Sequence, residues 1–160
     1  MMATIDHPVR IQQGCSSDLN AVMSVMDSAF GDRFGEAWTR SQLSGILPMA
    51  GVSLTIAWNR DSGEALGFSL WRTVADESEL LLIAVHPDHH RCGVGRKLLS
   101  SFFDCARADG VSRVHLEVRD GNPAITMYRA AGFAPVGRRR NYYLAADGRR
   151  FDAITLALQL

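Results

Sequence analysis

The stretch Leu80–Leu99, LLLIAVHPDHHRCGVGRKLL, decides the fold class of this chain. Residues 80–85 form a continuous apolar run that is long enough for one buried strand and too short for a typical helix. Pro87 follows, and proline cannot donate a hydrogen bond to a strand ladder. After a basic turn that contains two glycines, apolar residues recur at helical spacing: Val94, Leu98, Leu99, Phe102, Phe103 and Ala106. The stretch therefore predicts a strand, a glycine-rich loop and a helix packed on a sheet.

The loop between this strand and this helix is a candidate phosphate site. The first turn of a helix has unpaired N–H groups and carries the positive end of the helix dipole. Gly93 and Gly95 have no Cβ to keep an anion away from the backbone, and Arg91 and Arg96 flank them. The spacing lacks the third glycine of a dinucleotide fingerprint and the GK[ST] of a P-loop. A short Gly-x-Gly also occurs in ordinary tight turns, so the spacing alone leaves both interpretations open.

The segment IAVHPDHHRCGVGRKLL resembles the acetyl-CoA motif of the GCN5-related N-acetyltransferases (GNAT), written Q/R-x-x-G-x-G/A after a strand. The glycines fit this pattern, and His90 stands where Gln or Arg is usual. The resemblance implies that the pantetheine arm and the thioester of acetyl-CoA meet the strand residues Ile83, Ala84 and Val85. It also implies that the pyrophosphate binds the loop and the first helical residues: Arg91, Cys92, Gly93, Val94, Gly95 and Arg96.

The composition is that of an ordinary globular protein, and we expect one domain over residues 1–160. Hydrophobic residues make up 47% of the chain and charged residues 21%, with a formal net charge of +0. This balance produces no overall field that attracts nucleic acid or an anionic membrane, so neither partner is expected. The cysteines lack metal-ligand spacing, and no signal pattern or membrane-length apolar run is present. We therefore expect a cytoplasmic protein with three reduced cysteines, Cys15, Cys92 and Cys105.

Strand and helix patterns alternate along the chain and predict an α/β fold. Strands are expected at 9–13, 52–58, 65–74, 80–85, 111–118, 133–143 and 151–158. Helices are expected after a cap at Ser16 or Ser17, at 36–47, from Val94 onward, and at 123–131 after a cap at Asn122. This order predicts a mixed, mostly antiparallel central sheet with helices on both faces. It also matches the GNAT fold, in which two central parallel strands diverge and the cofactor enters between them.

Glu117 is the candidate general base. It lies near the end of the strand 111–118 on its polar face, where a carboxylate can accept an amine proton directly or through water. Only a neutral amine attacks a thioester, and an α-amine with a pKa near 8 is roughly nine-tenths protonated at pH 7. A lone strand glutamate is otherwise typical of a solvated surface. The surrounding sequence LEVRDGN favours the catalytic interpretation.

Tyr128 is the candidate general acid. A phenol can protonate a departing thiolate, although a tyrosine in a helix often only packs against a sheet. The segment NPAITMYRAAGF resembles the N-x-x-A-x-x-L-Y-x-x-x-G-F region of the same family, in which Asn contacts the cofactor and Tyr faces its sulfur. That resemblance makes Asn122 a cofactor contact. The interval from Asn122 to Tyr128 is one residue shorter than the pattern, and we expect the turn near Pro123 to absorb the difference.

The segments LEVR, GRRRNYY (137–143) and DGRRFDA (147–153) together resemble the RimI-type ribosomal-protein-alanine N-acetyltransferases. The resemblance covers roughly residues 79–158. It implies transfer of acetyl from acetyl-CoA to the N-terminal amine of a protein, most specifically a ribosomal protein, without a metal. It further implies that Tyr142 or Tyr143 lines the acceptor groove, and that Phe34 and Trp38 face it from the first two helices. Packing of Phe34 and Trp38 in the core is an equally consistent interpretation.

Other functions stay open at this point. The same fold could act on lysine side chains or small amines, or serve as a non-catalytic acyl-CoA-binding module. RNA binding through Arg138, Arg139 and Arg140 would be strongly salt-dependent, and the neutral overall charge argues against it. The histidines at 86, 89 and 90 have no further ligand at metal spacing, and Cys92 has no nearby base. Neither a metal site nor a covalent acyl-enzyme is therefore expected.

Overall fold

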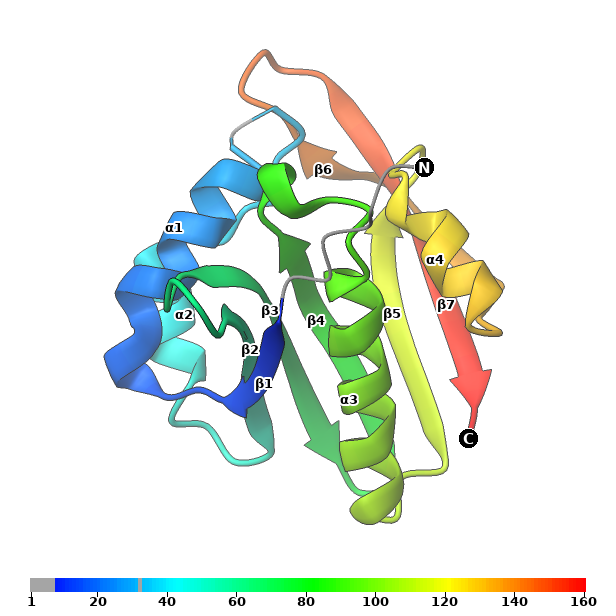
Figure 1. Cartoon of the computed structure of the whole chain (residues 1–160). Coiled ribbons are helices and arrows are strands. Elements are labelled where there is room, and N and C mark those ends of the chain that lie inside the picture. Colours follow the sequence, from blue (N-terminus) through cyan, green and yellow to red (C-terminus); the bar gives the residue numbers. More distant parts are fainter. Residues whose placement is uncertain (1–7, 32) are drawn as a thin grey trace, which may run out of the picture.

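Seven strands form one sheet in the computed structural model, which describes residues 8–31 and 33–160 (Figure 1). The sheet order is β1-β2-β3-β4-β5-β7-β6. The strands are β1 (Val9–Gln13), β2 (Val52–Asn59), β3 (Ala65–Val74), β4 (Glu77–Val85), β5 (Arg113–Arg119), β6 (Ala134–Leu144) and β7 (Arg150–Gln159). The helices are α1 (Leu19–Ala29), α2 (Arg40–Ile46), α3 (Val94–Ala108) and α4 (Ala124–Ala130), with 3-10 turns η1 (Ser16–Asp18) and η2 (Pro87–His89). The pairing of β4 with β5 is parallel and the other pairings are antiparallel, which confirms the predicted mixed, mostly antiparallel sheet.

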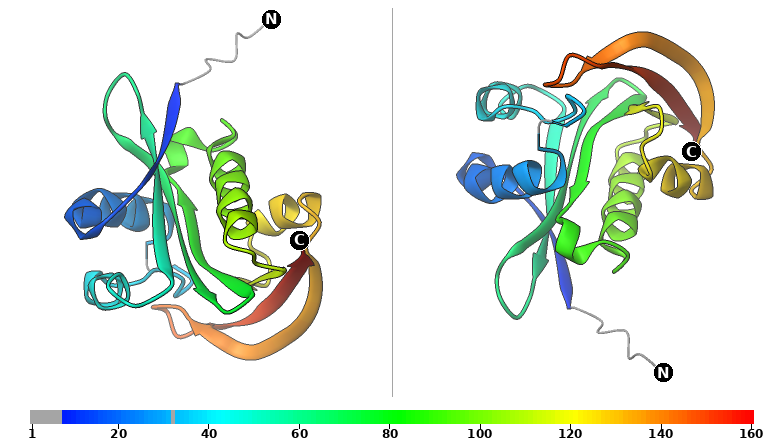
Figure 2. Two further views of the ribbon diagram at one scale, coloured as in Figure 1. Left: turned by 90° about the horizontal axis from the view of Figure 1, so that it is seen from below. Right: turned by 90° about the horizontal axis from the view of Figure 1, so that it is seen from above.

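Helices cover both faces of the sheet, as predicted. Helices α1 and α2 lie on one face, and α3 and α4 lie on the other (Figure 2). The core under α1 and α2 includes Met26, Leu43 and Phe68, and the core under α3 and α4 includes Phe102 and Leu116. In the described part of the chain, no helix is both long enough and apolar enough to cross a membrane.

The central strands β4 and β5 pair over only a short length. Their register joins Glu77–Leu80 to Arg113–Leu116, and beyond these residues each strand keeps only its outer neighbour, β3 or β7. A bulge marks the point of divergence, because Trp71 pairs with Leu80 while the preceding β3 residue pairs with Leu82, which leaves Leu81 as an extra residue. The carboxyl ends of the two central strands therefore separate, as expected from the sequence.

Several predicted boundaries were wrong. The second helix begins at Arg40 instead of residue 36, because Thr39 and Gln42 form a reciprocal capping box with bonds of 3.2 and 2.8 Å. The predicted caps Ser16 and Ser17 lie inside η1, whose own cap is Cys15, and the cap position of α1 is Asp18. Strand β4 also starts earlier than expected and β5 later, at the bounds given above. The expectation about the N-terminus concerns residues 1–7, which lie outside the described residues.

Candidate active site

The loop between β4 and α3 exposes its backbone to solvent. Gly93 caps α3 with a left-handed φ of 80°, and a Cβ placed there would meet no heavy atom within 4 Å. Arg91, Cys92 and Arg96 are exposed beside it. The N–H of Lys97 donates to the Gly93 carbonyl at 3.0 Å, so the N–H groups of the preceding residues have no acceptor within the helix. Exposed N–H groups, the positive helix end and two arginines together suit a diphosphate.

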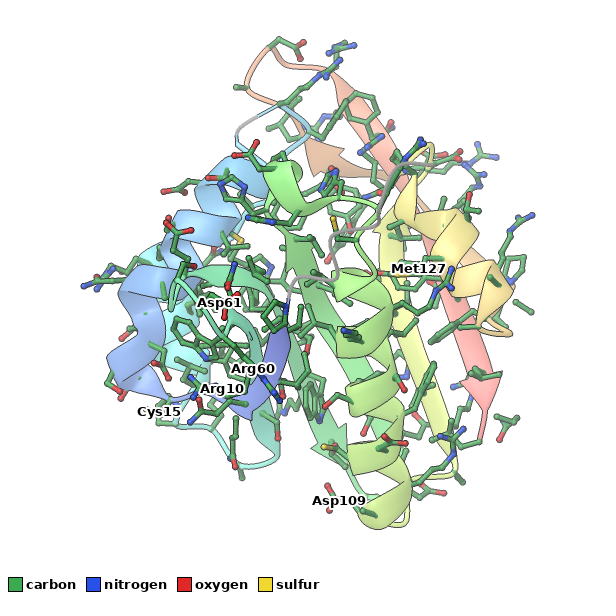
Figure 3. The ribbon with its side chains drawn as sticks, viewed as in Figure 1. Arg10, Cys15, Arg60, Asp61, Asp109 and Met127 are labelled. Carbon is green, nitrogen blue, oxygen red and sulfur yellow. The ribbon has the colours of Figure 1, made fainter. Side chains whose placement is uncertain are left out.

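The second glycine of the loop has a packing role as well. A Cβ on Gly95 would lie 3.3 Å from Met127 Sδ and 3.5 Å from Val85 Cγ2. Met127 is labelled on α4 in Figure 3, on the side of that helix that faces α3. Val94 is buried, so it can reach a ligand only through its main chain. Gly95 therefore allows α4 and β4 to pack closely against the first turn of α3.

Near its carboxyl end, β4 has main-chain groups on the edge that is no longer paired with β5. Hydrogen-bonded and non-hydrogen-bonded pairs alternate in an antiparallel ladder. His86 N–H donates to the Leu66 carbonyl at 2.8 Å, so the adjacent pair, Val85 with Gly67, is a non-hydrogen-bonded one. The N–H and C=O of Val85 therefore point away from β3. His90 Nε2 lies 3.0 Å from the Val85 oxygen, and it must carry the hydrogen because a carbonyl only accepts.

The other predicted strand contacts lie on both faces of β4. Ile83 and Val85 are partly buried and pack toward α3 with Val94. Ala84 is buried on the opposite face, in the core under α1. The N–H and C=O of Ala84 point toward β3, because its pair with Phe68 is a hydrogen-bonded one, so a ligand between β4 and β5 would meet the N–H and C=O of Ile83 and Val85.

Glu117 is anchored at the point where β5 has separated from β4. Its side chain is 15% exposed, and its Oε1 lies 2.7 Å from Arg139 Nε. Arg139 belongs to β6 and reaches Glu117 across β7. On β7, the fully buried Ala153 pairs with both Arg119 and Arg139, whereas Thr155 pairs with Glu117, so the ion pair runs diagonally past Ala153. A small residue there leaves room for the arginine, so the ion pair fixes the direction of the Glu117 carboxylate.

Tyr128 lies in the buried cluster below α3, with its ring edge-on to Phe133 at 5.8 Å between centroids. Burial raises the pKa of its hydroxyl well above the ordinary value, and the charges of Tyr143 and Glu36 raise it further. The phenol therefore keeps its proton at physiological pH and can donate it. The influence of Tyr143 and Glu36 also shows that groups from β6 and from the segment before α2 lie near this hydroxyl.

The two predicted groove tyrosines differ in position. Tyr142 is 49% exposed, whereas Tyr143 is half-buried, and their rings are perpendicular at 5.0 Å. Burial raises the pKa of Tyr143, and the nearby carboxylates of Glu36 and Glu117 act in the same direction. Tyr143 is therefore the tyrosine of the pair that lies close to the candidate base. Tyr142 lies in a bulge of β6 that faces Asp152.

Phe34 and Trp38 both make packing contacts. The guanidinium of Arg119 lies 3.7 Å from the centroid of the Phe34 ring, and the Phe151 ring meets Phe34 edge-on at 5.3 Å. Trp38 packs against the core under α1 and α2. Packing against the core is therefore confirmed for Trp38, whereas Phe34 packs on Arg119 and Phe151. Contact of either residue with an acceptor stays a prediction.

Two residues of this region, Glu36 and Arg119, were missed from the sequence. Glu36 accepts from Arg119 Nε at 3.0 Å and from Asn122 Nδ2 at 2.8 Å. The oxygen of the Asn122 side chain accepts from Ala124 N–H at 2.9 Å, so Asn122 does cap the start of α4. The one available signal was the arginine that ends LEVR on a buried strand, because a buried charge requires a partner.

The arginine run of β6 is largely neutralised by carboxylates. Arg138 Nη1 lies 2.7 Å from Asp152 and 2.9 Å from Asp120, and Arg139 pairs with Glu117. Two of the three arginines therefore have acidic partners on the same sheet, which weakens the case for an RNA-binding patch.

Comparison with known proteins gives consistent results. The profile of the Acetyltransferase (GNAT) family matches residues 19–133. The ribosomal protein bS18-alanine N-acetyltransferase of Escherichia coli K12 is 43% identical over 100 residues, which cover 62% of this chain and 67% of that protein. The N-alpha-acetyltransferase RimI of Mycobacterium tuberculosis is 43% identical over 102 residues, 61% of each chain. The crystal structure of the ribosomal-protein-S18-alanine N-acetyltransferase from Escherichia coli has a TM-score of 0.84 and 32% identity, covering 95% of this chain and 94% of that one.

Proposed function

Because this chain belongs to the acetyltransferase (GNAT) family, we propose that it transfers the acetyl group of acetyl-CoA to the N-terminal α-amine of a ribosomal protein. One observation carries the proposal: β4 and β5 separate before they reach Glu117, which its ion pair with Arg139 holds near the end of β5, while the Gly93 loop after β4 leaves its backbone exposed. Relatives named for the alanine of bS18 support a protein acceptor. A ribosomal acceptor and three free cysteines fit a location in the cytoplasm.

The residues of the separated strands suit acetyl-CoA. The loop residues 91–96 would hold its pyrophosphate through N–H groups and arginines, and Asn122 would add a contact. The main chain of residues 83–85 would meet the pantetheine arm. When bound, acetyl-CoA supplies a thioester, whose carbonyl carbon is open to attack by an amine.

Three groups of the chain would then act as base, oxyanion donor and acid. Glu117 accepts the proton of the α-amine through a water molecule, so that the neutral amine is present. The Val85 N–H, which points away from β3, stabilises the negative charge that develops on the carbonyl oxygen. Tyr128 donates its proton to the departing thiolate. The attacking nitrogen loses its second proton as the amide forms, and this proton restores the Tyr128 hydroxyl, while Glu117 returns its own proton to solvent. This assignment makes the transfer direct, without an acyl-enzyme.

The decisive experiment measures CoA release across a set of matched peptides. The set contains a peptide with a free N-terminal alanine, the same peptide with a blocked α-amine, and the blocked peptide with an added lysine. We expect release only with the free α-amine. Release with the blocked lysine peptide alone would instead indicate a lysine acetyltransferase. No release with any amine, together with measurable acetyl-CoA binding, would indicate a binding module.

Alkylation of the three cysteines tests the position of the pyrophosphate. Cys92 lies in the Gly93 loop, whereas Cys15 precedes η1 and Cys105 lies farther along α3, and all three are free and exposed. CoA at ten times its Kd should slow alkylation of Cys92 roughly tenfold, because only unliganded protein would react. Mass spectrometry of the modified peptides measures each rate, with Cys15 and Cys105 as internal controls. An unchanged rate at Cys92 would contradict the assignment of the loop.

The pH profile tests the assignment of the acid. Because the pKa of Tyr128 is raised, its neutral, proton-donating form is retained at every pH below that value. We expect kcat/KM for the acceptor peptide not to fall between about pH 8, where the α-amine loses its proton, and about pH 10. Initial rates between pH 6 and pH 10 provide the measurement. A decline that begins below pH 9.5 would be inconsistent with a buried phenol as the donor.

A further inference from the structure

The segment before α2, residues 33–39, reaches the half of the sheet that is formed by β5, β7 and β6. Helices α1 and α2 themselves pack over β2, β3 and β4. The segment nevertheless contacts three other strands: Phe34 meets Phe151 of β7, Gly35 meets the Leu144 backbone of β6, and Glu36 pairs with Arg119 of β5. It therefore spans the side of the sheet where β4 and β5 have separated, next to the β6–β7 hairpin (Figure 1).

The contact with β5 is a buried ion pair. The Arg119 side chain is 8% exposed and that of Glu36 is 12% exposed. The Arg119 guanidinium is stacked on Phe34, and its Nη1 donates to the Asp120 carbonyl at 3.2 Å. The Glu36 carboxylate is thus the negative partner of a desolvated cation, and a buried cation of this kind depends strongly on its partner.

Both oxygens of Glu36 are engaged. Oε1 accepts from Arg119 and Oε2 accepts from the Asn122 side chain, which also caps α4. Each oxygen of the carboxylate therefore already accepts a hydrogen bond from a group of the protein. Its arrangement suits orientation of the surrounding elements better than acid–base chemistry.

We propose that Glu36 is a positioning residue: its bonds to Arg119 and Asn122 hold segment 33–39 against the end of β5, as the wall on which the acceptor N-terminus binds beside Glu117. This inference rests on the proposed function, since it concerns the acceptor of the same site. Gly35 allows the same segment to lie close to β6. Its φ is 72°, and a Cβ there would collide with the Leu144 carbonyl.

The test compares Glu36→Gln with Glu64→Gln, a matched change at an exposed residue of the β2–β3 turn. Loss of the charge leaves Arg119 buried without its ionic partner, so the segment should detach. We expect the acceptor KM to rise at least tenfold in Glu36→Gln, whereas the Kd for acetyl-CoA rises much less, because Asn122 loses its bond to Glu36 but keeps its bond to Ala124. A role in overall stability alone would alter both constants together, and that result would overturn the proposal.

Gly35→Ala provides a second variant that displaces the same segment without removing any charge. It should reproduce the selective rise in acceptor KM. Hydrogen exchange gives a readout that does not depend on activity: amides 33–39 should exchange faster in both variants, and those of α3 should be unchanged. Unchanged exchange at 33–39 in Glu36→Gln would refute the positioning role. If the wild-type protein acetylates no peptide, the proposed function fails, while the exchange comparison still decides the role of Glu36.

Discussion

Replacement of Glu117 by Gln is expected to lower kcat about 100-fold or more, which is the usual contribution of a positioned general base. The amide keeps the size of the side chain and can no longer accept the amine proton. The affinity for acetyl-CoA should stay within twofold, because Glu117 lies on β5 and the Gly93 loop follows β4. Steady-state kinetics and calorimetric binding of acetyl-CoA separate these two effects.

Alkaline pH supplies an internal control for this variant. Above about pH 9 most of an α-amine is already neutral, so the first deprotonation no longer depends on Glu117 and the deficit of Glu117→Gln should narrow. Glu64→Gln serves as the matched variant at an exposed position. Undiminished turnover in Glu117→Gln would remove Glu117 from the mechanism. A deficit that is constant with pH would assign to it a positioning role, through its ion pair with Arg139.

Replacement of Tyr128 by Phe is expected to lower kcat by about 100-fold, because the thiolate would then leave without a positioned proton donor. The substitution retains the ring and its edge-on contact with Phe133, so the melting temperature should change little. Single-turnover measurements with saturating acetyl-CoA isolate the transfer step. A variant that loses acetyl-CoA affinity but keeps its transfer rate would show that the hydroxyl contributes to binding and not to proton donation.

Most of the fold could be predicted because its signals are local. The apolar run 80–85 was found in β4, which starts earlier than expected, and the periodic helix was found as α3, with Gly93 of the glycine loop as its cap. The second helix was misplaced because Ala37 and Trp38 continue a helical apolar pattern, whereas the capping box at Thr39 starts the helix later. Residues 36–38 are therefore part of the connection, and this error concealed the role of Glu36.

In the candidate site, too, some residues could be predicted from the sequence and others could not. Glu117 and Tyr128 could be proposed from residue type, alternation and neighbouring motifs. Their partners could not, because Arg139 lies two strands from Glu117 in the sheet, and the pair depends on the small Ala153 between them. The pairing of Glu36 with Arg119 joins positions 83 residues apart, and no pattern in either segment indicates it.

The sequence by itself determined the family resemblance and the order of strands and helices, and it predicted a phosphate site at the Gly93 loop and a candidate base and acid in Glu117 and Tyr128. Each of these follows from residue type and short-range spacing, which set backbone conformation and local chemistry. Only the tertiary structure decided how far β4 and β5 pair, what orients Glu117, and how segment 33–39 is attached to the far strands. These features depend on contacts between distant segments, which form only once the sheet and both helix layers are assembled.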